Sequence, residues 1–131
     1  MTEHDPLLKY REQHKHRLNY MPWLYWSLKP KNRVWAEAWQ KDYQAYLMEM
    51  ETVEIGENCF ISPLAHIFAE PGRKISIGDN TFIAADCTLH GPLHIGSEVA
   101  INHHSILDGG RVGIKIHDQV RIAAYCHLYA F

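Results

Sequence analysis

An aliphatic residue returns every six positions in the second part of this chain, from Val53 to Phe131. The twelve positions form four groups of three, and each is Ile or Leu: Ile55, Ile61, Ile67, Ile77, Ile83, Leu89, Ile95, Ile101, Leu107, Ile116, Ile122 and Leu128. A small residue follows four places after most of them: Cys59, Ala65, Thr81, Cys87, Val99, Ser105, Val120 and Cys126. A period of six is neither the two of a strand nor the 3.6 of a helix, and it indicates a β-solenoid.

Three hexapeptides close one triangular coil, with the aliphatic side chains inside and a small residue at each tight turn. The coils begin 22, 18 and 21 residues apart, at Ile55, Ile77, Ile95 and Ile116. The two longer spacings predict insertions at Phe68 to Lys74 and Asp108 to Gly113, both of which contain glycine. Turn glycines are expected after the first aliphatic residue of a coil, at Gly56, Gly78 and Gly96, whereas His117 replaces glycine in the fourth coil.

Residues 1–52 have no such period and are interpreted as an N-terminal helical segment, with the solenoid domain covering 53–131. Asp5 and Pro6 resemble an N-cap and first turn, which predicts a short helix to about Arg17. Lys29-Pro30 should end any preceding helix. A second helix is predicted from Asn32 to Met50.

The second helix should present an aromatic and apolar face. Its residues recur at spacings of three and four: Trp35, Ala38, Trp39, Asp42, Tyr43, Tyr46, Leu47 and Met50. The favoured interpretation is that this face packs on the solenoid or on a neighbouring subunit. A second hypothesis is that Trp23, Tyr25 and Trp26 line a pocket for a small-molecule acceptor, because amphipathic aromatic side chains suit such pockets.

Composition limits the partners of the chain. Its formal net charge is −2 without basic clusters in the repeat region, so no nucleic-acid partner is expected. No apolar run approaches the roughly 20 residues of a membrane span, and the start of the chain is too polar for a signal peptide. The three cysteines all occupy small positions of the repeat, where they should act as compact buried groups rather than form disulfides. We therefore expect a cytoplasmic protein.

The hexapeptides Ile-Gly-Glu-Asn-Cys-Phe from residue 55, Ile-Gly-Asp-Asn-Thr-Phe from 77 and Ile-Gly-Ser-Glu-Val-Ala from 95 resemble those of the hexapeptide-repeat acyltransferases. The resemblance covers about sixty per cent of the chain. It implies a mainly β fold, a left-handed parallel β-helix, here preceded by two short α-helices. It also implies a homotrimer with active sites in the clefts between subunits.

Within that family the chain is most similar to the galactoside, maltose and xenobiotic O-acetyltransferases. The similarity rests on Ile101-Asn102, on Ser105 to Asp108 closing the same coil, and on the Ile-x-x-x-Val-x-Ile-Ala that follows the insertion. It implies acetyl-CoA, or another acyl-CoA, as co-substrate and a hydroxyl of a sugar or similar small molecule as acceptor. Asn102 and Asp108 are implied to contact the acceptor.

Acyl transfer to a hydroxyl needs a general base, for which histidine is suited. The family's catalytic histidine lies about five residues after the position of Leu128, which is beyond Phe131. The sequence thus predicts a β-helix without its C-terminal coils, and leaves open whether this 131-residue form is active. The candidates for a base within the chain are His103 and His104, which follow Asn102 and should face outward.

Two other functions remain as alternatives. The γ-carbonic anhydrases share the solenoid, and Leu89-His90-Gly91-Pro92 resembles part of their zinc motif. That motif has another histidine five residues earlier, where this chain has Ala85, so no metal is expected. The second alternative is a non-catalytic trimeric scaffold.

Overall fold

The structure, a computed structural model, describes residues 6–131, so the predicted N-cap at Asp5 lies outside the described residues. Helix α1 (Pro6–Tyr20), the 3-10 helix η1 (Pro22–Ser27) and helix α2 (Pro30–Met50) come first. Twelve short strands follow: β1 (Val53–Ile55), β2 (Phe60–Ile61), β3 (His66–Phe68), β4 (Ile75–Ile77), β5 (Phe82–Ile83), β6 (Thr88–His90), β7 (Leu93–Ile95), β8 (Ala100–Ile101), β9 (Ile106–Asp108), β10 (Ile114–Ile116), β11 (Arg121–Ile122) and β12 (His127–Tyr129).

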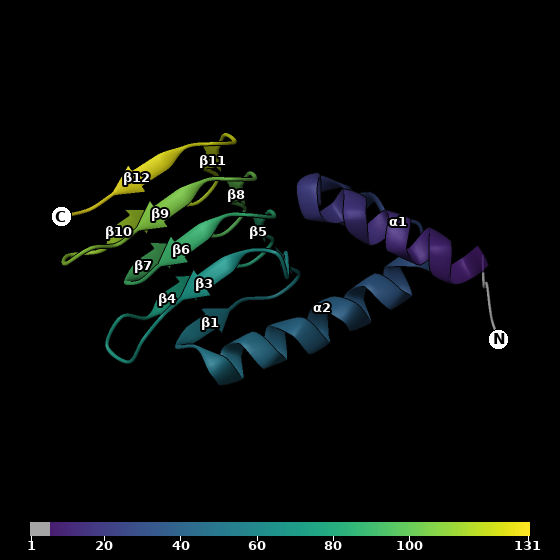
Figure 1. Cartoon of the computed structure of the whole chain (residues 1–131), viewed down its shortest axis with the longest axis horizontal. Coiled ribbons are helices and arrows are strands. Elements are labelled where there is room, and N and C mark those ends of the chain that lie inside the picture. Colours follow the sequence, from purple (N-terminus) through teal and green to yellow (C-terminus); the bar gives the residue numbers. More distant parts are fainter. Residues whose placement is uncertain (1–5) are drawn as a thin grey trace.

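The strands form three parallel four-stranded sheets, one for each side of the solenoid (Figure 1). Their orders are β1-β4-β7-β10, β2-β5-β8-β11 and β3-β6-β9-β12, so every strand pairs with the strand three places along the chain. The register aligns equivalent positions of successive coils, as in Ile61 with Ile83 and Ile83 with Ile101. This confirms the predicted solenoid of about four coils.

The aliphatic series forms the core of the solenoid. Ile61, Ile83 and Ile101 have no exposed surface, and the other members are at most 7% exposed except at the two ends of the series, Ile55 and Leu128. Burying each interior side chain contributes roughly 1.5–3 kcal/mol. Ile55, in the first coil, is half-buried. Leu128, in the last coil, is 37% exposed because no further coil covers it.

At the corners of the solenoid, the glycines of the repeat and the left-handed residues occupy different positions. Gly56, Gly78 and Gly96 do not have positive φ, and instead allow successive coils to approach closely. A Cβ on Gly78 would lie 2.7 Å from the carbonyl carbon of Gly96. The left-handed residues come two places after these glycines and their equivalent in the fourth coil: Asn58, Asn80, Glu98 and Gln119. Asp86, His104 and Tyr125 are the left-handed residues of a second corner.

Both predicted insertions are loops at the third corner of the solenoid. One follows β3 and the other follows β9, so they project from the same edge. A hydrogen bond from Arg73 Nη2 to the carbonyl of Gly110, 2.6 Å long, joins them. They therefore form one surface feature.

Helix α2 has 21 residues and is longer than predicted. Its buried face was predicted in part: Leu47 is buried, and the predicted aromatic residues Trp35, Trp39 and Tyr43 pack against the apolar clusters. Tyr46 and Met50 are instead mostly exposed, and Ala36 and Gln40 are buried without having been predicted. Gln40 is buried on this face because its side chain makes a polar contact with the solenoid. The side chain of Gln40 accepts a hydrogen bond from Ile61 N at 2.7 Å and donates one to Ile61 O at 3.1 Å. Gln40 thus satisfies the open edge of β2 as a neighbouring strand would.

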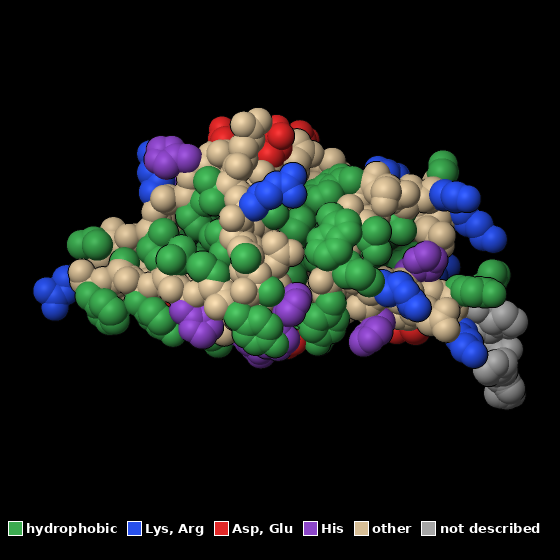
Figure 2. Space-filling model, turned by 90° about the horizontal axis from the view of Figure 1, so that it is seen from above, with side chains coloured by type: hydrophobic (Ala, Val, Ile, Leu, Met, Phe, Trp, Pro, Cys, Tyr) green, Lys and Arg blue, Asp and Glu red, His purple; other side chains and the backbone are tan. Residues whose placement is uncertain are grey.

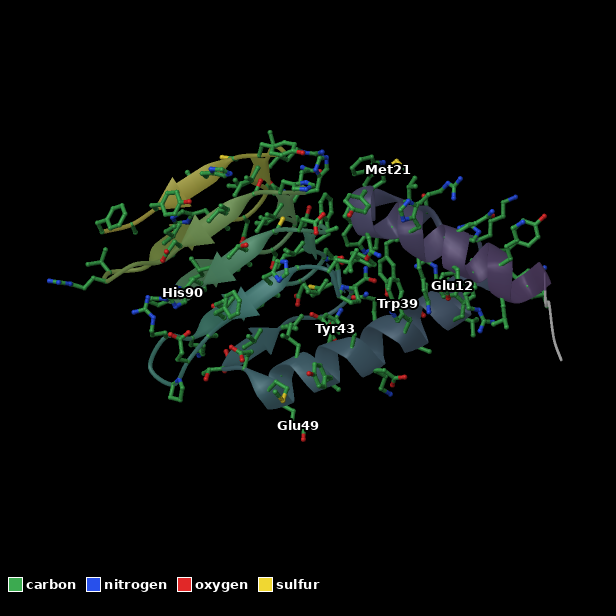
Figure 3. All side chains as sticks on the ribbon, in the orientation of Figure 1. Glu12, Met21, Trp39, Tyr43, Glu49 and His90 are labelled. Carbon is green, nitrogen blue, oxygen red and sulfur yellow. The ribbon has the colours of Figure 1, made fainter. Side chains whose placement is uncertain are left out.

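A second apolar cluster joins the helices to the outer face of the β2-β5-β8-β11 sheet. Leu18, Tyr25 and Ala36 bury Phe60 and Phe82, with several tryptophans packed around them. In Figure 3, Trp39 and Tyr43 point from α2 toward the rest of the protein, whereas Glu49 points away. This confirms the favoured interpretation that the helical segment packs on the solenoid. Within residues 6–131, the structure contains no helix that is long and apolar enough to cross a membrane.

Candidate functional site

The two adjacent histidines lie at a corner of the solenoid where three successive coils align. Asp86, His104 and Tyr125 are the left-handed residues at this corner, with φ values of 60°, 61° and 60°. Because each is three residues after a buried isoleucine, the coil register stacks them in one column. His103 precedes His104 and is half-buried. Seen from above, several histidines lie among large hydrophobic side chains along one edge of the molecule (Figure 2).

Short contacts connect these side chains. His104 Nε2 lies 3.4 Å from Asp86 Oδ2, and His104 Nδ1 is 2.8 Å from His103 Nδ1. The His104 ring also stacks on Tyr125 with 4.7 Å between centroids and 11° between planes. His103 meets Tyr125 edge-on at 5.5 Å. The cluster is therefore held by both polar and aromatic contacts.

In the 2.8 Å contact between the two Nδ1 atoms one ring donates and the other accepts, and which does so depends on the tautomers. A neutral His104 that carries its proton on Nε2, facing the Asp86 carboxylate, must accept through Nδ1. His103 then donates from Nδ1 and keeps the lone pair of Nε2. The structure gives His103 Nε2 no hydrogen-bond partner among residues 6–131. In that pair of tautomers, this nitrogen can accept a proton from a bound molecule.

Tyr20, the last residue of α1, adds a contact from outside the solenoid. Its hydroxyl donates to Asp86 Oδ2 at 2.9 Å, and its ring lies 6.0 Å from that of His103. The hydrogen bond to Asp86 raises the pKa of Tyr20, so the phenol remains a donor. Helix α1 is anchored beside the cluster because Asn19 O accepts from Ala85 N and Asn19 Oδ1 accepts from Ser62 Oγ.

Asn102 lies beside His103, directly after β8. Its Nδ2 donates to the carbonyl of Ile122 at 2.9 Å, which fixes the side chain on the next coil. Its Oδ1 has no hydrogen-bond partner among the residues that the structure describes. Asn102 therefore presents a fixed acceptor next to the His103 ring.

Asp108 lies at the other end of β9, in a separate group with the two loops. Its Oδ1 accepts from Gly110 N at 2.9 Å and lies 3.6 Å from His90 Nδ1. The second ring nitrogen of His90 contacts Glu70 Oε2 at 3.1 Å, and this bond lowers the pKa of Glu70. Figure 3 shows His90 on the solenoid, away from the helices. Asn102 and Asp108 thus do not meet in one chain.

Four histidines of the solenoid, His90, His94, His103 and His104, do not gather at one place. His90 contacts Glu70, His94 Nδ1 lies 2.8 Å from Ser76 Oγ, and His103 and His104 contact each other. No group of three or more His, Cys, Asp or Glu residues in the described part of the chain is arranged to hold a metal ion.

The cysteines are free thiols within the hexapeptide pattern. Cys59 and Cys87 are buried, and Cys126 in the last coil is half-buried. Burial raises the pKa of the Cys59 and Cys87 thiols to about 11. These two thiols are therefore protonated and unreactive at neutral pH.

Asp86, Tyr125 and Tyr20 were missing from the sequence-based candidates. Asp86 and Tyr125 carry a signal in the sequence, since both occupy the position of His104 in adjacent coils. Tyr20 carries none, because the docking of α1 is not encoded in the repeat. Comparisons of the chain with protein-family models, curated proteins and solved structures found no match.

Proposed function

We propose that the chain is an acyltransferase of the hexapeptide-repeat type, which transfers an acetyl group from acetyl-CoA to a hydroxyl of a sugar or similar small acceptor. The observation that carries this proposal is the Asp86–His104–His103 series, which leaves a histidine nitrogen free beside Asn102. An imidazole oriented by a carboxylate through a second group is a recurring design for a general base. Here the orienting groups come from successive coils.

In the proposed reaction His103 Nε2 takes the proton of the acceptor hydroxyl as its oxygen attacks the thioester carbonyl. His104 holds the His103 ring through the bond between their Nδ1 atoms, and Asp86 stabilises the positive charge that develops on the histidine pair. The protonated His103 then returns the proton to the departing thiolate of CoA. The C–S bond breaks, the ester C–O bond forms and no proton is gained or lost overall.

Asn102 is proposed to position the acceptor, because its Oδ1 is free while its Nδ2 is held by Ile122 O. The role of Asp108 stays a proposal from the family resemblance: Gly110 N occupies its Oδ1, and Oδ2 has no hydrogen-bond partner among residues 6–131. A second contact to the acceptor could be made by Asp108 only if the site is completed by another subunit. A homotrimer, which the family resemblance implies, would provide this other subunit.

The remaining parts of the proposal are the left-handed sense of the β-helix, the trimer with clefts between subunits, and a cytoplasmic location. The hexapeptide pattern supports the first two through its family resemblance. The three free thiols suit a reducing compartment.

The test is acetyl transfer by the purified chain. CoA release and acetylated product would be quantified by chromatography with a panel of glycosides as acceptors. We expect activity, and a loss in kcat of about 10²–10⁴-fold in His103→Gln. His94→Gln, which alters a histidine elsewhere on the solenoid, is the matched control and should retain full activity. Asn102→Ala should raise KM or lower kcat without changing the oligomer measured by light scattering.

An inactive protein, or equal activity in His103→Gln and His94→Gln, would remove the proposed base. A stable trimer without transfer to any acceptor would instead favour the scaffold function.

A further inference from the structure

A hollow of about 450 Å3 opens between η1 and the outer face of the β2-β5-β8-β11 sheet. This volume falls within the roughly 300–1,000 Å3 of small-molecule sites. We call it the tryptophan pocket, and the residues that line it include Trp23, Trp26, Phe82, Glu98, Ala100 and Arg121. It shares no residue with the histidine cluster.

The pocket exists because of the small side chain of Ala100. The sheet register places Phe60, Phe82, Ala100 and Arg121 in one column on the outer face. The two phenylalanines are covered by the helical segment, whereas Ala100 leaves space in the next coil. The hollow therefore lies where the column changes from a large side chain, Phe82, to a small one, Ala100.

Aromatic rings form two sides of this space. Trp23 and Trp26 lie 6.4 Å and 6.1 Å from Phe82, measured between ring centroids. Trp26 is held in place because its Nε1 donates to Asn58 O at 3.0 Å. Trp23 is 50% exposed, which is unusual for an aromatic side chain in contact with a core. An indole face accessible at the rim of a pocket suits a bound cation.

Two opposite charges lie on the remaining sides. In the described part of the chain, the side chains of Glu98 and Arg121 take part in no hydrogen bond or ion pair with each other or with another residue. A cationic ligand would be repelled by Arg121 and an anion by Glu98. A neutral polyol would offer both charges hydroxyl hydrogen bonds comparable to those of the water that it displaces, and no opposite charge. A zwitterion gives each charge an opposite partner.

We propose that the tryptophan pocket binds a small zwitterion, with its alkylammonium end over the tryptophan rings beside Glu98 and its oxyanion end at Arg121. Arg121 supplies the forked donors that recognise an oxyanion. The aromatic faces and Glu98 attract the ammonium group. This inference is independent of acetyl transfer.

The test is calorimetric titration of the full chain with phosphocholine at low ionic strength. We expect a Kd of about 1 mM, at least about tenfold tighter than for choline, inorganic phosphate or methyl β-D-glucopyranoside. Trp23→Ala should weaken phosphocholine binding about tenfold. Phe68→Ala, which removes another aromatic side chain that is 50% exposed, is the matched control and should bind normally.

Two further variants keep the test independent of folding. Arg121→Gln should abolish the preference for phosphocholine over choline. Ala100→Phe should fill the pocket and abolish binding, and should fold because Phe82 occupies the same column. Equal binding of choline and phosphocholine, tighter binding of the glucoside, no binding of phosphocholine, or unchanged binding in Trp23→Ala in a protein with a native circular dichroism spectrum would each overturn the proposal.

Discussion

The contact between Gln40 and β2 gives a sharp test of how the solenoid begins. Gln40 is 2% exposed and Ile61 is fully buried, so water cannot easily replace the two hydrogen bonds between them. Gln40→Ala leaves one buried N–H and one buried C=O without partners. At about 1–3 kcal/mol for each orphaned group, with some relaxation, the free energy of unfolding should fall by about 3 kcal/mol.

Two neighbouring positions on α2 provide a graded comparison. Gln44 Nε2 donates two hydrogen bonds, to Cys59 O at 2.8 Å and to Gln40 Oε1 at 2.9 Å. Because Gln44 is only half-buried and water can replace its bonds, Gln44→Ala should cost about 1 kcal/mol. Lys41 is exposed, and Lys41→Ala should change stability by less than about 0.5 kcal/mol. All three substitutions introduce the same helix-favouring residue, which cancels most of the propensity effect.

Stability would be measured by urea unfolding monitored by circular dichroism, with the m-value checked for constancy. Amide exchange provides a local readout, because Gln40→Ala should accelerate exchange of the Ile61 N–H much more than that of Ile101. If Gln40→Ala were as stable as Lys41→Ala, or if exchange of the Ile61 N–H were unchanged, the idea that the Gln40 side chain pairs with the edge of β2 as a strand would be wrong.

Two other predictions concern the coils. Gly78→Ala should destabilise the protein by about 3 kcal/mol, measured by urea unfolding, because its Cβ meets the Gly96 backbone; Gly72→Ala, with φ +85° but open space, should cost only about 1 kcal/mol. The pKa values of Cys59 and Cys87, raised to about 11 from 9.0, mean that the unfolded chain loses these protons first. The free energy of unfolding should therefore not depend on these thiols below about pH 9, and should fall between about pH 9 and about pH 11. Measuring the same pH dependence in a cysteine-free variant tests whether the thiols cause the fall, because that variant should lack it.

The repeat made most of the solenoid predictable. Its six-residue period defines which side chains enter the core and where the two insertions occur, and the structure has both as expected. The buried face of α2 was found only in part in this way. Tyr46 and Met50 were included for their hydrophobicity but are exposed, whereas the polar Gln40 is buried because its side chain forms hydrogen bonds with a strand edge.

The candidate site was predictable only where the repeat defines it. His103 and His104 were identified by their place after Asn102, and the column containing Asp86 follows from the same register. Tyr20 comes from a helix whose docking depends on contacts between distant segments, such as Asn19 with Ser62. A single sequence contains no periodic signal for those contacts. The acceptor roles of Asn102 and Asp108 stay predictions.

The coil between Ile77 and Ile95 has 18 residues and no insertion, so it is one complete repeat of the solenoid along its axis. Duplicating it would lengthen the solenoid by about 4.8 Å, the spacing of paired strands, without altering the helix that closes its first edge. Each added copy would move the last coil away from α2 by the same step while preserving the direction of every side chain. The protein can thus be used as a molecular spacer whose length is set by counting repeats.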